Sequence, residues 1–195
     1  MSTLQIHSHP QKHQAEIFWG EIAPCEHLLQ IYDHEPVFLD SLQGFVGGGL
    51  TTGDAVIVIA TEDHLAALDE RLAKQGLDLQ AFRLQHQYIP LEAQETLSKF
   101  MVDGWPDESL FEQLIFQLLA RARGSGRRVR AFGEMVALLW AHGHNGATVR
   151  LESLWHSICQ REAFSLFCAY PRSGFTQDTE SSIQEICAVH SKVLH

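Results

Sequence analysis

The sequence has few basic residues and few cysteines, and it lacks any long apolar run. Its 195 residues include 14 Lys and Arg against 24 Asp and Glu, which gives a formal net charge of −10. Proteins that bind nucleic acid generally carry a basic surface, so we expect no direct contact with nucleic acid. The arginines that cluster at positions 121–130 are expected to stabilise the C-terminal end of a helix instead.

No apolar run approaches the roughly 18 residues of a membrane-spanning helix, and the N-terminus is polar, unlike a signal peptide. We therefore expect no membrane segment, and the cytoplasm is the expected compartment. The four cysteines, Cys25, Cys159, Cys168 and Cys187, stand far apart without a CxxC pair. The spacing predicts neither a disulfide framework nor a zinc site, and three of these thiols are expected to be buried.

The histidines give no better indication of a metal. His7, His9 and His13 have no acidic or thiol partners nearby, and His142 and His144 lie in a glycine-rich loop. We predict no metal site, and the sequence does not indicate which cofactor, if any, the protein binds.

The composition, with 45% hydrophobic and 19% charged residues, is that of a globular protein. We predict one domain over residues 25–195, preceded by an extension over residues 1–24. The extension becomes apolar at residues 17–19. This stretch is expected to pack on the domain or on a second chain, which leaves a homo-oligomer open.

Short apolar strands alternate with amphipathic helices throughout the domain. Strands are predicted at residues 27–32, 55–60, 87–91, 129–133 and 164–170. The run 55–60 has no polar alternation, which is typical of a strand buried on both faces of a parallel sheet. We predict that glycines 47–49 end the first helix and that residues 176–194 form one last helix. The fold class is therefore α/β, with a mostly parallel sheet and helices on both faces.

Ligands of such sheets bind beyond the carboxyl ends of the strands. The residues that leave those ends, with one tryptophan on a nearby loop, are the candidate ligand-binding residues, and none of them is assigned a catalytic role. They are Tyr32, Asp33, Thr61, Glu62, His64, Trp105, Glu134 and Tyr170.

The stretch 44–64 resembles a phosphate-binding unit with one fault. A phosphate loop places its glycines after the strand, followed by Lys and Ser or Thr, but here the glycines precede the strand. Glu62 and Asp63, which follow it, would repel a triphosphate. Glu134 is open to two interpretations: it is a general base or ligand-binding group, or it caps the helix that follows it.

Several motifs together resemble the MEDS domain, the sensory domain named for methanogens, methylotrophs and DcmR-type regulators. They lie at residues 27–33, 49–61, 100–106, 129–140, 151–155 and 164–171. The resemblance implies a three-layer, RecA-like core that has lost its nucleotide-binding loop, and a role in sensing small organic ligands. Such domains often stand beside histidine kinases, response regulators or DNA-binding modules. The family offers no catalytic residue to carry over to this chain.

Three hypotheses for function follow. The first is a non-enzymatic cytoplasmic sensor that binds a small organic ligand and signals through a protein partner such as a histidine kinase, a response regulator or a transcription regulator. The second is a nucleotide-dependent, ATPase-like enzyme in which Glu134 activates water. The third is an interaction or oligomerisation module that acts through the apolar part of residues 1–24.

Overall fold

The computed structural model of the chain describes residues 19, 22–124, 126–174 and 180–194. The strands of its main sheet are β1 (His27–Tyr32), β2 (Ala55–Ala60), β3 (Tyr88–Glu92), β6 (Val129–Gly133), β7 (Ser165–Pro171) and β8 (Lys192–Leu194). A separate antiparallel pair consists of β4 (Met101–Val102) and β5 (Trp105–Pro106). The helices are α1 (Glu35–Thr51), α2 (Glu62–Lys74), α3 (Leu79–Leu84), α4 (Ala93–Ser98), α5 (Glu108–Arg123), α6 (Met135–Ala141), α7 (Asn145–Glu162) and α8 (Glu180–Ala188).

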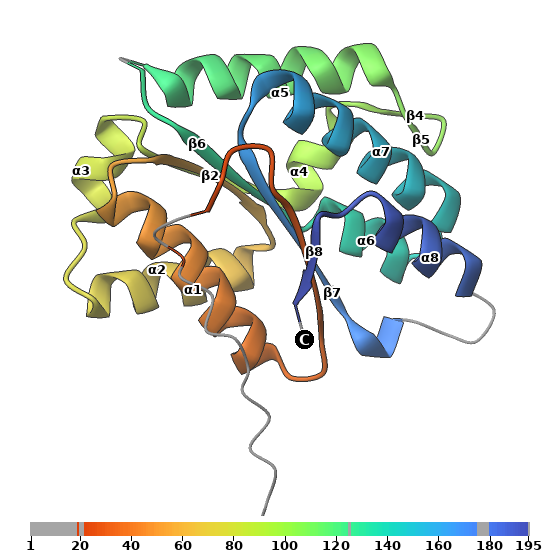
Figure 1. The fold of residues 1–195 in the computed structure, drawn as a ribbon, viewed down its shortest axis with the longest axis horizontal. Coiled ribbons are helices and arrows are strands. Elements are labelled where there is room, and N and C mark those ends of the chain that lie inside the picture. The colour runs from red at the N-terminus through yellow and green to blue at the C-terminus, as the bar shows by residue number, and fades with distance from the viewer. Residues whose placement is uncertain (1–18, 20–21, 125, 175–179, 195) are drawn as a thin grey trace, which may run out of the picture.

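The six strands of the main sheet lie in the order β3-β2-β6-β7-β1-β8, and all neighbouring pairs are parallel (Figure 1). Every residue of β2 is buried, as its unbroken Val and Ile run predicted. The α/β class and the parallel sheet predicted from the sequence are confirmed.

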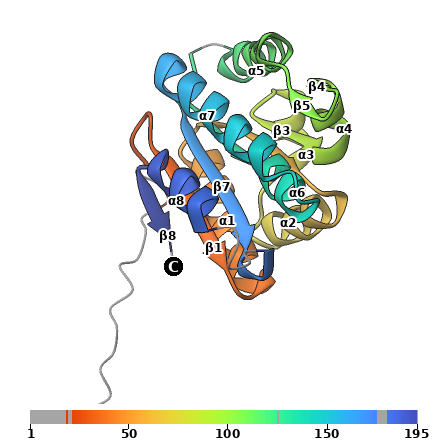
Figure 2. The ribbon, with the colours of Figure 1, turned by 90° about the vertical axis from the view of Figure 1, so that its right-hand side faces the viewer.

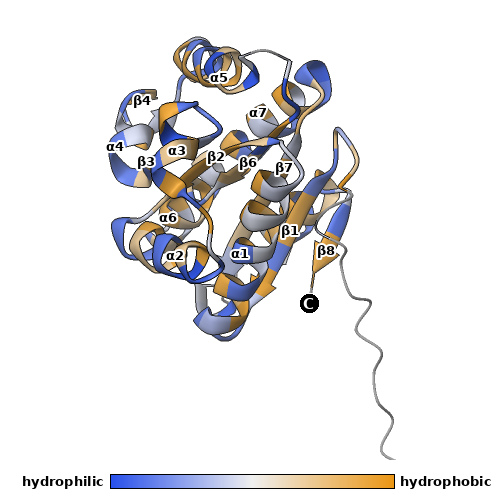
Figure 3. Ribbon diagram, turned by 90° about the vertical axis from the view of Figure 1, so that its left-hand side faces the viewer, coloured by the Kyte–Doolittle hydropathy of each residue, from blue (hydrophilic) through white to orange (hydrophobic). Residues whose placement is uncertain are grey.

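Helices cover both faces of the sheet and make a three-layer structure. Val56 and Val58 of β2 face the layer formed by α1, α2 and α3, where they pack with residues such as Phe45. Ile57 and Ile59 face the opposite layer, formed by α4 to α8. Apolar residues accordingly line the sheet and the inner sides of the helices (Figure 3). Within the described part of the chain, none of the helices is both long enough and apolar enough to cross a membrane.

The prediction that glycines 47–49 end the first helix is wrong, because α1 continues through them to Thr51. These glycines instead allow close packing. A Cβ on Gly44 would lie 2.5 Å from the Trp19 ring, and one on Gly49 would lie 2.9 Å from Cδ of Arg130. The turn that does end the helix contains Gly53, which has a φ of +86°. Trp19, the described residue of the apolar stretch 17–19, packs on the domain, whereas its neighbours 17 and 18 lie outside the described residues.

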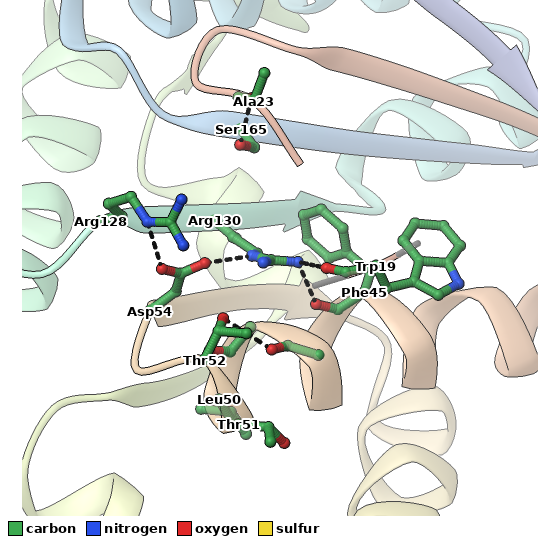
Figure 4. Close-up of polar contacts among 12 residues, drawn as sticks. Trp19, Ala23, Phe45, Leu50, Thr51, Thr52, Asp54, Arg128, Arg130 and Ser165 are labelled. Atoms are coloured by element: carbon green, nitrogen blue, oxygen red, sulfur yellow. Dashed lines mark hydrogen bonds and ion pairs between the residues drawn. The ribbon is translucent and has the colours of Figure 1, made fainter. Parts of the chain in front are cut away.

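An ion pair buried beside α1 explains the close approach at Gly49 (Figure 4). Nε of Arg130 lies 2.7 Å from Oδ2 of Asp54, and both side chains are almost completely buried. The other Asp54 oxygen pairs with Arg128 at 2.9 Å. The Arg130 guanidinium also donates to the carbonyl oxygens of Trp19 and Phe45. Part of the basic cluster at positions 121–130 therefore stabilises the interior and not a helix end.

The prediction of a single last helix over residues 176–194 is also wrong. Residues 175–179 lie outside the described residues, α8 ends at Ala188, and β8 pairs with the edge of β1 (Figure 2). The Ser191 N–H donates to the His27 carbonyl at 2.7 Å, and the His27 N–H donates to Oγ of Ser191 at 2.9 Å. The unpaired backbone groups of β1 thus determine the conformation of this segment, and the helical pattern of its apolar residues does not.

Candidate functional site

The strand order creates one place where a site is expected. From β2 the chain passes to β3 on one side, whereas from β6 it passes to β7 on the other side. The neighbours β2 and β6 therefore flank a topological switch point, where ligands of open α/β sheets bind. Ile59 and Gly133 are opposite each other in the register, so Thr61 and Glu134 leave the sheet side by side.

Glu134 joins the two strand ends at this point. Its backbone N–H donates to the Ile59 carbonyl at 2.8 Å. Its carboxylate accepts the Thr61 N–H at 2.9 Å with one oxygen, and the other oxygen lies 2.7 Å from Nδ1 of His64. Glu134 stands at the N-cap position of α6, but its side chain makes no capping bond there, so the carboxylate acts as a cross-strand group.

Local structure places His64 opposite Glu134. Thr61 is the N-cap of α2, and its hydroxyl accepts the His64 N–H at 3.4 Å, which fixes the first turn of the helix. The imidazole packs edge-on against the Phe38 ring of α1 at 5.0 Å, and Phe38 in turn stacks on Tyr32 at 4.8 Å. On its outer side, Nε2 of His64 lies 3.6 Å from the exposed carboxylate of Glu35. Tyr32, Glu35, Phe38, Thr61, His64 and Glu134 are called the Glu134 site below.

The charges of the Glu134 site shift two pKa values. Partial burial lowers the pKa of His64, but the hydrogen bond and charge of Glu134, together with Glu35, outweigh burial and raise it above 6.5. Burial, followed by the negative charges of Glu134 and Glu35, raises the pKa of Tyr32 to about 12. Tyr32 is therefore a neutral hydroxyl at physiological pH, and His64 carries more positive charge than an ordinary histidine.

Four of the eight predicted residues, Tyr32, Thr61, His64 and Glu134, come together in this site. The other four do not join its contacts. Asp33 forms an exposed ion pair with Arg172 at 2.9 Å, and Glu62 is exposed in the first turn of α2. Trp105 is half-exposed on β5 and lies over Gly146, and Tyr170 is buried against Glu152 of α7, to which its hydroxyl donates at 2.5 Å.

Sequence reasoning missed Glu35 and Phe38 as members of the site. Both stand on the helix that directly follows Tyr32, and this position was the available signal.

A hollow of about 510 Å³ lies elsewhere, toward the amino ends of the strands. It is lined by Gly44, Gly47 and Gly48 of α1 and by Gln75 and Leu77 after α2. It therefore does not coincide with the Glu134 site.

The comparison with protein families assigns the sequence to a known group. The family model described as the methanogen/methylotroph, DcmR sensory domain, MEDS, matches residues 26–191. The chain belongs to the MEDS family. A search of curated proteins finds no match for this MEDS domain. The resemblance noted in the sequence is thus confirmed, and with it a family whose name denotes a sensory role.

The start of α2 in this MEDS domain is not arranged to hold a phosphate. A phosphate-binding helix start offers free N–H groups, but here the Thr61 N–H is bonded to Glu134 and the His64 N–H to Thr61. Glu62 and Asp63 add negative charge at the same turn. The arrangement favours a hydrogen-bond donor or a cation over an anion.

Proposed function

We propose that this chain is a non-enzymatic, cytoplasmic signal-sensing domain that binds a small organic ligand at the Glu134 site. The observation that carries the proposal is the bond of a single carboxylate to both Thr61 and His64 at the switch point. The helix after Thr61 covers one face of the sheet, and the helix after Glu134 covers the other. A ligand that takes His64's place on Glu134 therefore changes how α2 is held relative to α6. The ligand then binds one arrangement of these helices better than the other, which is what a sensor requires.

The chemistry of the site indicates the class of ligand. Glu134 and Glu35 supply negative charge, and exposed Glu62 and Asp63 extend it along the same edge. Tyr32 and Phe38 supply an aromatic flank. A small organic amine, or another compact molecule with a hydrogen-bond donor and an apolar part, complements these groups.

The same contacts give less support to the ATPase-like alternative. A general base needs a carboxylate oxygen within reach of the attacking water, and both Glu134 oxygens already accept hydrogen bonds from the protein. The charges at the start of α2 oppose a triphosphate. We therefore place water activation by Glu134 second to ligand sensing.

Ligand screening tests the proposal. Thermal-shift assays followed by calorimetry would compare small amines, alcohols, carboxylates and magnesium ATP. We expect amines or other donors to stabilise the protein, and Glu134→Gln to abolish the effect. Glu62→Gln is the matched control, because it removes an exposed charge from the same edge and is expected to keep binding. Tight binding of magnesium ATP, or no binding by any class, would contradict the proposal.

The output of the sensor is proposed to pass through a partner protein, such as a histidine kinase, a response regulator or a transcription regulator. The interaction-module hypothesis differs in placing the contact at residues 1–24. Light scattering of the full chain and of a variant without residues 1–18, which keeps Trp19, separates the two. An oligomer that disappears with this deletion supports the interaction module, and an unchanged state supports the sensor.

A further inference from the structure

A second polar cluster lies inside the molecule, on the face of the sheet that α7 and α8 cover (Figure 2). It is formed by His27 at the start of β1, Glu152 of α7, Cys168 of β7 and His190, which follows α8. One ligand atom from each of the four lies within 4.8 Å of the others. The four side chains are almost completely buried. They are called the His27 cluster below.

Both imidazoles are held with Nε2 turned toward the cluster. Nδ1 of His27 lies 3.2 Å from the Val189 carbonyl oxygen, and Nδ1 of His190 lies 2.5 Å from the Ile186 carbonyl oxygen. A carbonyl oxygen only accepts, so Nδ1 carries the proton in each ring and Nε2 presents a lone pair. Histidines that bind metals are held in this way in most proteins.

The nitrogen–oxygen distances inside the cluster are too long for good hydrogen bonds, and three of the distances between ligand atoms are close to the spacing of ligand atoms around a metal. Nε2 of His27 and Nε2 of His190 each lie 3.5 Å from Oε2 of Glu152, and Nε2 of His27 lies 3.5 Å from Sγ of Cys168. Among the described residues, Oε2 of Glu152 and Nε2 of His190 have no hydrogen-bond partner. Ligand atoms around a tetrahedral zinc ion lie roughly 3.3–3.6 Å apart, as bond lengths of about 2.0–2.3 Å require.

The surroundings also suit a metal. Tyr170 donates to the other oxygen of Glu152 at 2.5 Å and so orients the carboxylate.

We propose that His27, Glu152, Cys168 and His190 bind a zinc ion. Two imidazoles, a thiolate and a carboxylate are a donor set that zinc accepts, and four protein ligands make a closed, structural site. His190 lies between α8 and β8, so the ion fastens residues 180–194 to the sheet. The sequence predicted no zinc site, because the four ligands come from four separate elements and no pair has the close spacing of a zinc motif.

Metal analysis and cobalt substitution test the site directly. After chelation and dialysis, the full chain is titrated with Zn²⁺ and, separately, with Co²⁺. We expect a single equivalent of either ion, proton release on binding, an intense tetrahedral cobalt spectrum and a thiolate-to-cobalt charge-transfer band. Hydrogen exchange of residues 180–194 is expected to slow when zinc is added. Failure of the wild-type chain to bind either ion would overturn the proposal.

Variants separate the cluster from adventitious binding. Cys168→Ser is expected to remove the charge-transfer band. Cys159→Ser is expected to keep it, because the buried Cys159 thiol donates to the Phe164 carbonyl and lies outside the cluster. Tyr170→Phe retains all four ligands and is expected to weaken zinc about 10–100-fold by releasing the Glu152 carboxylate. Circular dichroism verifies that each variant folds. If Cys168→Ser does not fold, the zinc affinity of Tyr170→Phe tests the site instead. A band that survives Cys168→Ser, or that depends on Cys159, would overturn the assignment.

Discussion

At the scale of single residues, Glu134 and His64 determine what the switch point can do. The position of Glu134 at a strand end was visible in the sequence, but its partners were not. Thr61 and His64 are about seventy residues away along the chain and become neighbours only when β2 and β6 pair. The sequence therefore indicated four of the residues at this edge, missed Glu35 and Phe38, and could not predict which residues bond to one another.

His64 gives this site a pH dependence of defined sign. Its pKa is raised in the folded protein, so its contribution to the free energy of unfolding is fully present below the unfolded value of about 6.5 and is lost as the pH rises through the folded value. Urea unfolding of the wild type and of His64→Asn should therefore differ most at low pH and converge above the folded pKa. His144→Asn, at an exposed position, is the control. A constant difference across this range would refute the assigned role of Glu134 as the partner of His64.

The buried pair of Asp54 and Arg130 gives a second prediction for single residues. Asp54→Ala removes one carboxylate from this buried ion pair and should destabilise the protein by about 3–5 kcal/mol. Asp40→Ala breaks an exposed ion pair with Arg71 and should cost no more than about 1 kcal/mol. Chemical denaturation measures both. Equal losses would mean that burial of the pair has no special effect.

At the scale of elements, α1 and α8 show where local patterns fail. Helix α2 begins after its N-cap Thr61 and ends shortly before Gly76, which has a positive φ, as local signals for a helix start and end require. Helix α1 instead continues through three glycines, where Gln75 lies against Gly47, Trp19 against Gly48 and Arg130 against Gly49. Residues 189–194 leave the helical pattern because the edge of β1 is unpaired without them. Both errors come from contacts with residues far away in the sequence.

The packing on α1 predicts a reversed effect of a common stabilising substitution. Gly→Ala inside a helix usually gains up to about 1 kcal/mol. At Gly49 the new methyl would lie 2.9 Å from both Arg130 and Val56, so Gly49→Ala should instead cost about 1–3 kcal/mol. Gly47→Ala meets mainly the movable end of Gln75 at 3.0 Å and should cost clearly less. Thermal unfolding compares the two, and a more stable Gly49→Ala protein would show that the close approach is absent.

At the scale of the whole molecule, the class of fold was predictable, but the packing at the sheet edge and at the chain ends was not. Buried apolar strands that alternate with helices allow few arrangements other than a parallel three-layer sheet. The role of Tyr170 was harder to predict, because β7 turns this side chain toward Glu152 and away from the Glu134 site. The sequence allowed the apolar stretch 17–19 to pack either on the domain or on a second chain. Its one described residue, Trp19, lies on the domain.

Trp19 provides a test of how the N-terminal segment is held. Its ring contacts Phe45 and Phe167, each with ring centroids 6.1 Å apart, and covers Gly44. Trp19→Ala should destabilise the domain. Its cost should be smaller than the loss of about 3–5 kcal/mol that follows when a fully buried tryptophan is replaced by alanine. The control is Trp105→Ala, half-exposed on β5, with an expected change of about 0.5 kcal/mol or less. If denaturation shows no loss for Trp19→Ala, the segment is not held on α1.

The most direct test of the sensing account follows the His64 imidazole by nuclear magnetic resonance in histidine-labelled protein. The ligand class that stabilises the chain most in the thermal screen is added stepwise. We predict a saturable change of the Nδ1–H signal as the ligand displaces His64 from Glu134, and an affinity at least about tenfold weaker in Glu134→Gln. Saturable binding that leaves the His64 signal unchanged, or equal affinity in Glu134→Gln, would contradict the account.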